Sequence, residues 1–354
     1  MHKIILTGLL STFILLSLFA CNEKKPTPKS DFVIANGQMP NITKDKAGNL
    51  HLVYGEGDSI MYTYSSDMGN SFSSPTLVAV LPKLFSFATR GPQISATNND
   101  LIITACTSTG NIYSYFKEKD GWKQGARIND LDTIAKEGLM GLSADGENAF
   151  AVWQDLRINK KNNIYGAKSD DGGRTWSKNF LVYKSPDSLV CPCCKPSVAM
   201  KGKNVYVMFR NWLNGNRDLY LIHSSNGGKT FGNAEKLGRG SWELNGCPMD
   251  GGNLAINENG QVQTVWKRKE NIFTAMPDVP EINIGKGRGC TIETVNNKNI
   301  YSWTEGEEVI FVTSNGEKKV LGKGTQPVLK TLDKDYAICV WENEKQIHAS
   351  ILQL

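Results

Sequence analysis

After its first 20 residues the sequence has no apolar stretch long enough to span a membrane, and it has no long amphipathic helical pattern anywhere. The first absence leaves no candidate for a second membrane segment, and the second argues against a helical fold. A strong charge excess is missing too. The formal net charge is +5, partly contributed by lysines near the N-terminus, and gives no support for a nucleic-acid partner.

The N-terminus has the features of a secretory signal. Lys3 precedes an apolar run over residues 4–19, and small Ala20 precedes Cys21. Residues 18–21 (LFAC) resemble the bacterial lipobox, in which cleavage before the cysteine leaves its thiol to take a diacylglycerol. We therefore expect a lipoprotein signal peptide over 1–20, then lipidated Cys21 and a polar tether over 21–30. The resemblance implies membrane attachment in the bacterial cell envelope. The alternative is an ordinary cleaved signal.

One pattern occurs seven times after this leader. Each copy is a short inner segment, often led by proline, then a polar turn and a β-branched run that usually ends in an aromatic residue. The copies span 39–54, 91–106, 138–153, 195–209, 251–266, 288–303 and 325–341. A polar loop and a third strand-like run follow each copy. Short alternating strands bounded by Gly, Asn and Asp predict β-sheet.

Seven units between about residue 31 and the C-terminus average roughly 46 residues each, which is within the range of propeller blades. The sequence therefore predicts an all-β protein, a β-propeller of four-stranded antiparallel blades over 31–354. Seven blades are favoured, with the sequence before Met39 closing the ring against the last blade. Six blades are the alternative.

Three segments share the pattern S-x-[DN]-x-G-x-[TS]-[WF], namely 65–72, 169–176 and 224–231. In such a hairpin turn, Asp67, Asp171 or Asn226 caps neighbouring backbone N–H groups and glycine takes a positive φ. With this Asp-box motif, residues 39–354 resemble the sialidase superfamily of propellers. The resemblance implies that the boxes lie between the third and fourth strands, on the face away from the active site, and that they are structural.

Functional residues are therefore expected at the opposite end, where the inner strands begin and where the second strand joins the third. Several arginines facing several carboxylates there suit an acidic sugar or another polyhydroxyl ligand, because a guanidinium binds a carboxylate in a bidentate manner. The candidates are Arg90, Glu137, Asp155, Arg157, Arg210, Asp250 and Arg288. The alternative is a solvated rim of surface ion pairs.

The sequence departs from what the resemblance implies for a working sialidase: three arginines on the sialate carboxylate, a tyrosine nucleophile with a glutamate, and an aspartate acid/base. Residues 38–40 (QMP) replace the Arg-Ile-Pro of the first inner strand, and Tyr301 and Tyr336 fall in strand-like runs. Standard sialic acid hydrolysis is therefore not expected. Paired carboxylates such as Glu137 with Asp155 or Asp250 leave glycosidase-like acid/base chemistry open.

Five of the eight cysteines precede inner segments of three successive units, and adjacent blades would bring them together. They are Cys191, Cys193, Cys194, Cys247 and Cys290. Disulfides are one interpretation, for example Cys247 with one of the first three. A soft-metal site for Cu(I) or Zn is another, although no histidine supports it. A redox-active or catalytic thiol is the third. Cys106 and Cys339 lie in apolar runs and are expected in the core.

Two functions from different classes follow. The first is a cell-envelope propeller that binds an acidic glycan or acts on one as a glycosidase-like enzyme. The second is a non-enzymatic scaffold whose disulfide-stapled or metal-binding face holds a partner. We expect a monomer, with no nucleic-acid partner and no cofactor other than a possible metal at the cysteines.

Overall fold

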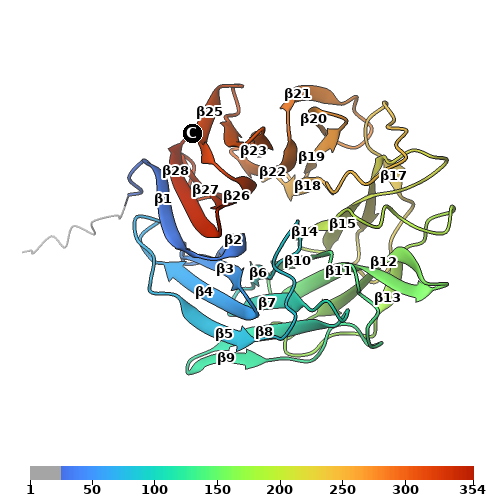
Figure 1. Cartoon of the computed structure of the whole chain (residues 1–354), viewed down its shortest axis with the longest axis horizontal. Helices are drawn as coiled ribbons and strands as arrows, with labels where there is room; N and C mark the ends of the chain where they lie inside the picture. The colour runs from blue at the N-terminus through green and yellow to red at the C-terminus, as the bar shows by residue number, and fades with distance from the viewer. Residues whose placement is uncertain (1–24) are drawn as a thin grey trace, which may run out of the picture.

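A computed structural model describes residues 25–354, and every regular element in this range is a β-strand. The strands form seven four-stranded antiparallel sheets arranged as blades around a central axis (Figure 1). The predicted seven-bladed propeller is confirmed, and the six-bladed alternative is wrong. The predicted signal peptide and Cys21 lie outside the described residues. Within 25–354 the structure has no helix that could cross a membrane.

In six blades the strands follow chain order from the axis outwards, and the last blade takes β1 as its outer strand. The inner strands contact one another around the ring. They are β2 (Gln38–Lys44), β6 (Gln93–Ala96), β10 (Met140–Asp145), β14 (Ser197–Lys201), β18 (Asn253–Ile256), β22 (Arg288–Val295) and β26 (Thr325–Thr331). The second strands are β3 (Leu50–Glu56), β7 (Leu101–Cys106), β11 (Asn148–Ile158), β15 (Asn204–Arg210), β19 (Val262–Arg268), β23 (Lys298–Glu305) and β27 (Tyr336–Asn343).

The third strands are β4 (Ser59–Ser65), β8 (Ile112–Glu118), β12 (Lys161–Ser169), β16 (Leu219–Ser224), β20 (Asn271–Ala275), β24 (Glu308–Val312) and β28 (Gln346–Gln353). The outer strands are β5 (Thr76–Val80), β9 (Gly121–Gln124), β13 (Phe180–Tyr183), β17 (Glu235–Lys236), β21 (Ile282–Lys286), β25 (Lys318–Lys323) and β1 (Lys29–Asn36). The last of these comes from the N-terminus of the chain.

The ring closes through this N-terminal strand, as the sequence predicted. β1 pairs antiparallel with β28, so both ends of the chain build the last blade (Figure 1). Phe32 and Ile34 of β1 pack against the core cluster that joins the first and last blades. The Asp31 backbone N–H donates a hydrogen bond to Ser350 Oγ of β28 at 3.0 Å. Closure therefore combines a strand ladder with burial of side chains.

The core lies between the blades and is filled largely by the second strands. Trp303 and Trp341 stand at equivalent positions of β23 and β27 and are fully buried. Each packs over a glycine in the outer strand of the preceding blade. A Cβ added at Gly285 would lie 2.4 Å from Trp303, and one at Gly322 would lie 3.1 Å from Trp341. These glycines let the indole rings approach the neighbouring backbone closely.

The three segments with the Asp-box pattern follow β4, β12 and β16, as expected, at the end of the axis opposite to where the inner strands begin. In the second of them Ser169 Oγ accepts from the Gly173 N–H at 2.9 Å, and Asp171 accepts from the Thr175 N–H at 2.9 Å. A Cβ at Gly173 would lie 2.7 Å from Ile102 of the preceding blade. The turn therefore packs one blade onto the next, which is a structural role.

Replacing Asp171 with alanine should destabilise the fold by about 1–2 kcal/mol, because the Thr175 N–H and hydroxyl lose their acceptor. Burial acts to raise the pKa of Asp171, but the hydrogen bonds from Thr175 outweigh it and hold that pKa below its usual value. The contribution is therefore present at neutral pH and is lost as the pH falls through the lowered pKa. Urea unfolding at pH 7 and at low pH measures both effects. Exposed Asp170 is the matched control, and an equal loss in Asp170→Ala would contradict the assignment.

Candidate functional site

A pocket of about 110 Å³ lies on the axis at the end where the inner strands begin, here called the pocket end. Its polar lining comes from the starts of inner strands in several blades and from the residues just before them. The side chains that line it with a polar group are Asn41, Thr89, Gln93, Lys195, Ser197, Asp250, Asn253, Thr291 and Gln326. Amides and hydroxyls that converge in this way can donate and accept hydrogen bonds to a polar ligand.

Lys195 supplies the positive charge in this pocket. It precedes β14 in the fourth blade, yet its Nζ donates to Gln93 Oε1 of the second blade at 2.7 Å, so the side chain reaches past the third blade. Burial lowers the pKa of the Lys195 amine to about 8. The amine therefore remains largely protonated at neutral pH and can pair with an anionic ligand group.

Asp250 supplies the negative charge, and its carboxylate is held by backbone N–H groups. Its Oδ1 accepts from the Gly252 N–H at 3.2 Å, and its Oδ2 accepts from the Gly289 N–H at 2.8 Å. These bonds join the loops that lead into the fifth and sixth blades. A Cβ added at Gly251 would lie 1.8 Å from the Lys195 carbonyl oxygen, so the loop also packs tightly on the chain around Lys195. Both charged groups therefore have fixed places.

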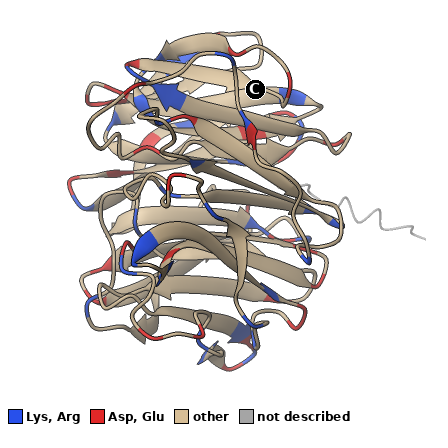
Figure 2. Ribbon diagram, turned by 90° about the vertical axis from the view of Figure 1, so that its right-hand side faces the viewer, with Lys and Arg blue, Asp and Glu red and all other residues tan. Residues whose placement is uncertain are grey.

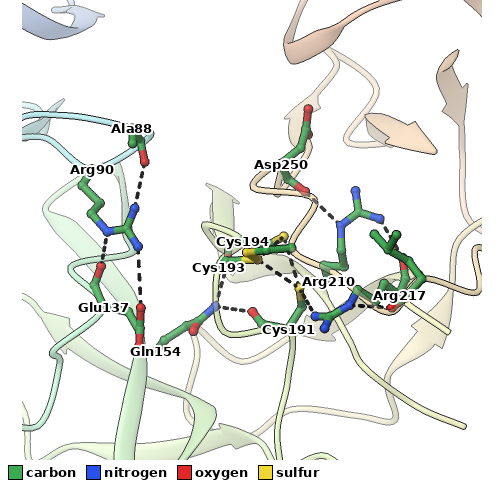
Figure 3. The surroundings of a disulfide bond; sticks show 12 residues. Ala88, Arg90, Glu137, Gln154, Cys191, Cys193, Cys194, Arg210, Arg217 and Asp250 are labelled. Carbon is green, nitrogen blue, oxygen red and sulfur yellow. Dashed lines mark hydrogen bonds and ion pairs between the residues drawn. A yellow bond between two sulfur atoms is a disulfide. The ribbon is translucent and has the colours of Figure 1, made fainter. Parts of the chain in front are cut away.

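Arg90 and Glu137 form a pair that is separate from the pocket lining. Arg90 Nη2 lies 3.6 Å from Glu137 Oε2, while its Nε donates to the Glu137 carbonyl oxygen and its Nη1 to that of Ala88. Figure 3 shows this pair well to the side of Asp250. The sequence offered Glu137 as a partner for the carboxylate of Asp155 or Asp250. In the structure Glu137 pairs with Arg90.

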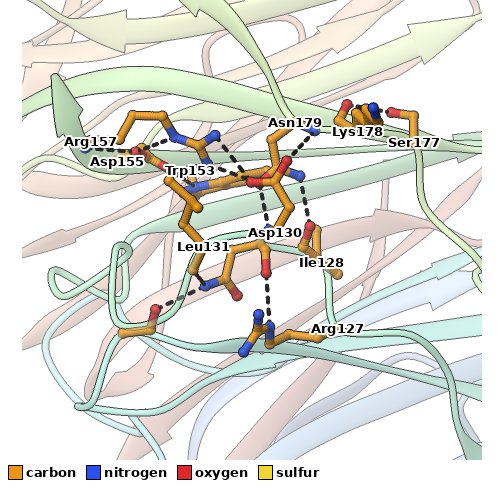
Figure 4. A network of polar contacts seen from close by, with 12 residues as sticks. Arg127, Ile128, Asp130, Leu131, Trp153, Asp155, Arg157, Ser177, Lys178 and Asn179 are labelled. Carbon is orange, nitrogen blue, oxygen red and sulfur yellow. Dashed lines mark hydrogen bonds and ion pairs between the residues drawn. The ribbon is translucent and has the colours of Figure 1, made fainter.

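Asp155 and Arg157 belong to a polar network between the second and third blades (Figure 4). Asp155 is fully buried and accepts from Trp153 Nε1 at 2.9 Å and from Arg157 Nε at 2.9 Å. Arg157 also lies 3.1 Å from Asp130 and donates to Asn179. Asp155 and Arg157 were each candidate ligand groups in the sequence, and in the structure they bind each other.

Arg210 is buried and donates to three backbone carbonyl oxygens, those of Asp250 at 2.9 Å, Arg217 at 2.7 Å and Lys267 at 2.8 Å. It therefore joins the fourth and fifth blades and places Asp250. Arg288 is exposed at the start of β22. The structure does not gather the predicted arginines into one clamp, because Arg90, Arg157 and Arg210 bind protein groups in three different places.

The cysteines come together beside the pocket, as the sequence predicted, except for Cys290. Cys193 and Cys247 form a disulfide, which confirms the predicted bridge from Cys247 to one of the first three cysteines. The Cys191 Sγ lies 3.7 Å from that of Cys193 and 3.4 Å from that of Cys194 (Figure 3). Cys290 instead lies in the hydrophobic cluster that contains Val265 and lines the axial pocket.

The turn that carries these cysteines is held from two blades. Gln154 of β11 donates from its Nε2 to the carbonyl oxygens of Cys191 at 2.8 Å and of Cys194 at 2.7 Å. Arg217 Nη1 donates to Cys191 Sγ at 2.9 Å. The hydrogen bond from Cys194 and the nearby guanidinium groups lower the pKa of the Cys191 thiol, although burial opposes them. Burial raises the pKa of Cys194.

The two remaining described cysteines behave as core residues, as predicted. Cys106 and Cys339 are buried in two different hydrophobic clusters. Burial raises the pKa of each thiol to about 12. Neither is therefore a candidate for thiolate chemistry.

Lys195 is the main pocket residue that the sequence did not single out as a ligand group. Its position before an inner strand was a signal, since it placed the residue at the pocket end. What the sequence did not show is that its side chain reaches Gln93, two blades away. Gly251 was also missed, because its need for close backbone contact depends on the packing of two blades.

Comparison with solved structures finds propellers over nearly the whole chain. One is a protein of unknown function from Dyadobacter fermentans, with 14% identity, a TM-score of 0.54, and coverage of 93% of this chain and 99% of that chain. Another is an ulvan lyase, a polysaccharide lyase solved with a GlcA and sulfated-rhamnose unit, with 9% identity, a TM-score of 0.55, and coverage of 91% and 95%. A third is the lectin SapL1 in complex with α-methyl fucoside, with 12% identity, a TM-score of 0.52, and coverage of 84% and 99%.

The likeness is one of fold. No protein family and no curated protein matches the sequence. At such low identity the neighbours support the β-propeller fold and nothing finer. Membership of the sialidase superfamily therefore stays a prediction from the motif.

Proposed function

We propose that the protein is a propeller that binds an acidic glycan in the axial pocket. The observation that carries the proposal is the pocket itself, where amides and hydroxyls from several blades surround the Lys195 amine and the Asp250 carboxylate. A sugar ring presents hydroxyls that both donate and accept, and a uronate adds a carboxylate for Lys195. The carboxylate and amine would form a charge-assisted hydrogen bond.

Two proteins of similar fold were solved with sugars, so this fold can hold a ligand of the proposed class. The ulvan lyase was solved with a glucuronate-containing ligand and the lectin with a fucoside. The arginines that the sequence suggested as ligand groups do not support the proposal, because Arg90, Arg157 and Arg210 bind protein groups. Lys195 and the neutral polar groups around it would bind the carboxylate of the ligand in place of arginines.

The test is a binding panel of acidic oligosaccharides and their neutral analogues, read by titration calorimetry with the wild type and two variants. Lys195→Met keeps much of the side-chain length but removes the charge, so affinity for acidic glycans should fall about tenfold or more. Affinity for neutral analogues should change little. Lys203→Met is the control, since Lys203 is exposed in the turn after β14, away from the pocket end. Absence of any glycan binding, or an equal loss in both variants, would overturn the proposal.

A further inference from the structure

Four cysteine residues of the described chain meet beside the axial pocket, three of them buried and the fourth, Cys247, exposed. Cys191, Cys193 and Cys194 form a buried group of their own, in which every pair of sulfurs lies within 4.8 Å. The fourth sulfur, that of Cys247, is bonded to Cys193. Residues from the loops before the fourth and fifth blades thus supply all four, and their convergence depends on the propeller.

The spacing of the sulfurs matches that of metal-bound thiolates. Four thiolates bound about 2.3 Å from one tetrahedral ion lie about 3.8 Å from each other. The Cys191, Cys193 and Cys194 sulfurs are separated by 3.4, 3.7 and 4.0 Å. Cys247 becomes the fourth ligand once its disulfide bond to Cys193 is broken. The three other sulfurs then need little movement to bind the ion.

The surroundings can neutralise such a site. Arg217 donates to Cys191 Sγ at 2.9 Å, and Arg210 lies close enough to act on the same thiol. Four thiolates and one divalent cation carry a net charge of −2, which the two guanidinium groups balance. Gln154 holds the Cys191–Cys194 turn through two carbonyl oxygens, so the ligands have outer partners that fix their orientation.

We propose that Cys191, Cys193, Cys194 and Cys247 form a redox-gated site for a thiophilic d¹⁰ cation, Zn(II) or Cu(I). In the oxidised form the Cys193–Cys247 disulfide occupies two of the ligands, and only two thiols remain. A dithiol reductant supplies two electrons and two protons. It opens the disulfide to two thiols and leaves as its own disulfide. The cation then binds the sulfurs, and the displaced thiol protons pass to solvent.

This assignment separates the four cysteines from Cys290, which the sequence had grouped with them. Cys290 is buried among the core residues of the next two blades and lines the axial pocket. It is therefore a matched control, since it is a buried cysteine at the same end of the same propeller. The proposal also goes beyond glycan binding, because it does not use the axial pocket.

The experiment compares the intact protein before and after anaerobic reduction with dithiothreitol, followed by removal of the reductant. Co(II) is the spectroscopic probe for a Zn(II) site, and Cu(I) is titrated against a chromophoric chelator. The reduced wild type should bind one equivalent, with intense thiolate-to-Co(II) charge transfer and tetrahedral ligand-field bands. The oxidised protein should bind at least about tenfold more weakly. Binding of Zn(II) alone or Cu(I) alone at one equivalent supports the proposal and identifies the ion.

Variants assign the ligands. Cys191→Ser leaves the disulfide intact for folding, and after reduction it should bind roughly 100-fold more weakly, as should Cys247→Ser. Arg217→Met should keep the stoichiometry with about tenfold weaker binding. Cys290→Ser should bind as the wild type does. Failure of the reduced wild type to bind either ion, or an equal loss in Cys290→Ser and Cys191→Ser, would overturn the proposal.

Discussion

Replacing Arg210 with methionine should lower the free energy of unfolding by about 3–5 kcal/mol. The guanidinium is buried and donates to the carbonyl oxygens of Asp250, Arg217 and Lys267. A buried acceptor left without its donor costs about 1–3 kcal/mol, and methionine leaves three of them. Since the three carbonyls belong to the fourth and fifth blades and the loop between them, the contact between these blades should loosen.

Equilibrium unfolding in urea measures this loss. Arg239→Met is the control, because Arg239 is exposed in the loop after β17, and its stability should stay within about 0.5 kcal/mol of the wild type. A loss below about 1 kcal/mol in Arg210→Met would show that the three hydrogen bonds of Arg210 do not hold the fourth and fifth blades together. Arg210 would then be available as the ligand group that the sequence suggested.

Removing β1 should have the second large effect. A chain that begins at Gly37 loses the ladder from Lys29↔Ile351 to Asn36↔Gln346 and the packing of Phe32 and Ile34 on the core. The hydrogen bonds of this ladder and the two partly buried side chains together contribute ~5 kcal/mol or more to the free energy of unfolding. The uncovered edge of β28 should also promote association between chains.

The matched control is a chain that begins at Lys25, which keeps β1 whole. Thermal unfolding and light scattering should show the wild-type melting transition and a monodisperse species for this control. The chain from Gly37 should melt much earlier and aggregate. Equal melting temperatures for the two chains would mean that ring closure does not depend on β1.

The fold could be predicted from the sequence because each blade repeats local signals. Proline or a small residue begins the inner strand, a polar turn follows, and the second strand ends in a bulky residue such as Trp303 or Trp341. Closure by the N-terminus was also predictable, because the strand before Met39 had no other partner in the repeat. The packing of each tryptophan over a glycine of the preceding blade could not be predicted, because it joins residues of different repeats.

The candidate site was predicted only in part. Position in the repeat placed Asp250 and the cysteines correctly at the pocket end, and it suggested a bridge from Cys247. Position could not show that Arg157 faces Asp155 and Asp130 or that Arg210 faces three carbonyl oxygens. A charged side chain in a loop indicates a ligand site only when no other protein group binds it. Whether one does depends on tertiary contacts, which the sequence does not show.

The two candidate sites share one stretch of chain. Lys195 follows Cys194 directly, and Gly251 packs on the Lys195 carbonyl four residues after Cys247. The loops that hold the sulfurs therefore also position the charged groups of the pocket. The disulfide closes a span of 54 residues, and such a bridge contributes about 2–4 kcal/mol to stability.

The most direct test of glycan recognition is a crystal structure of the protein with the acidic oligosaccharide that binds best in the panel. We expect the sugar in the axial pocket, with its carboxylate within hydrogen-bond distance of Lys195 Nζ and its hydroxyls on the surrounding amides. A sugar bound on the outer strands or at the opposite end, with the axial pocket unchanged, would contradict it.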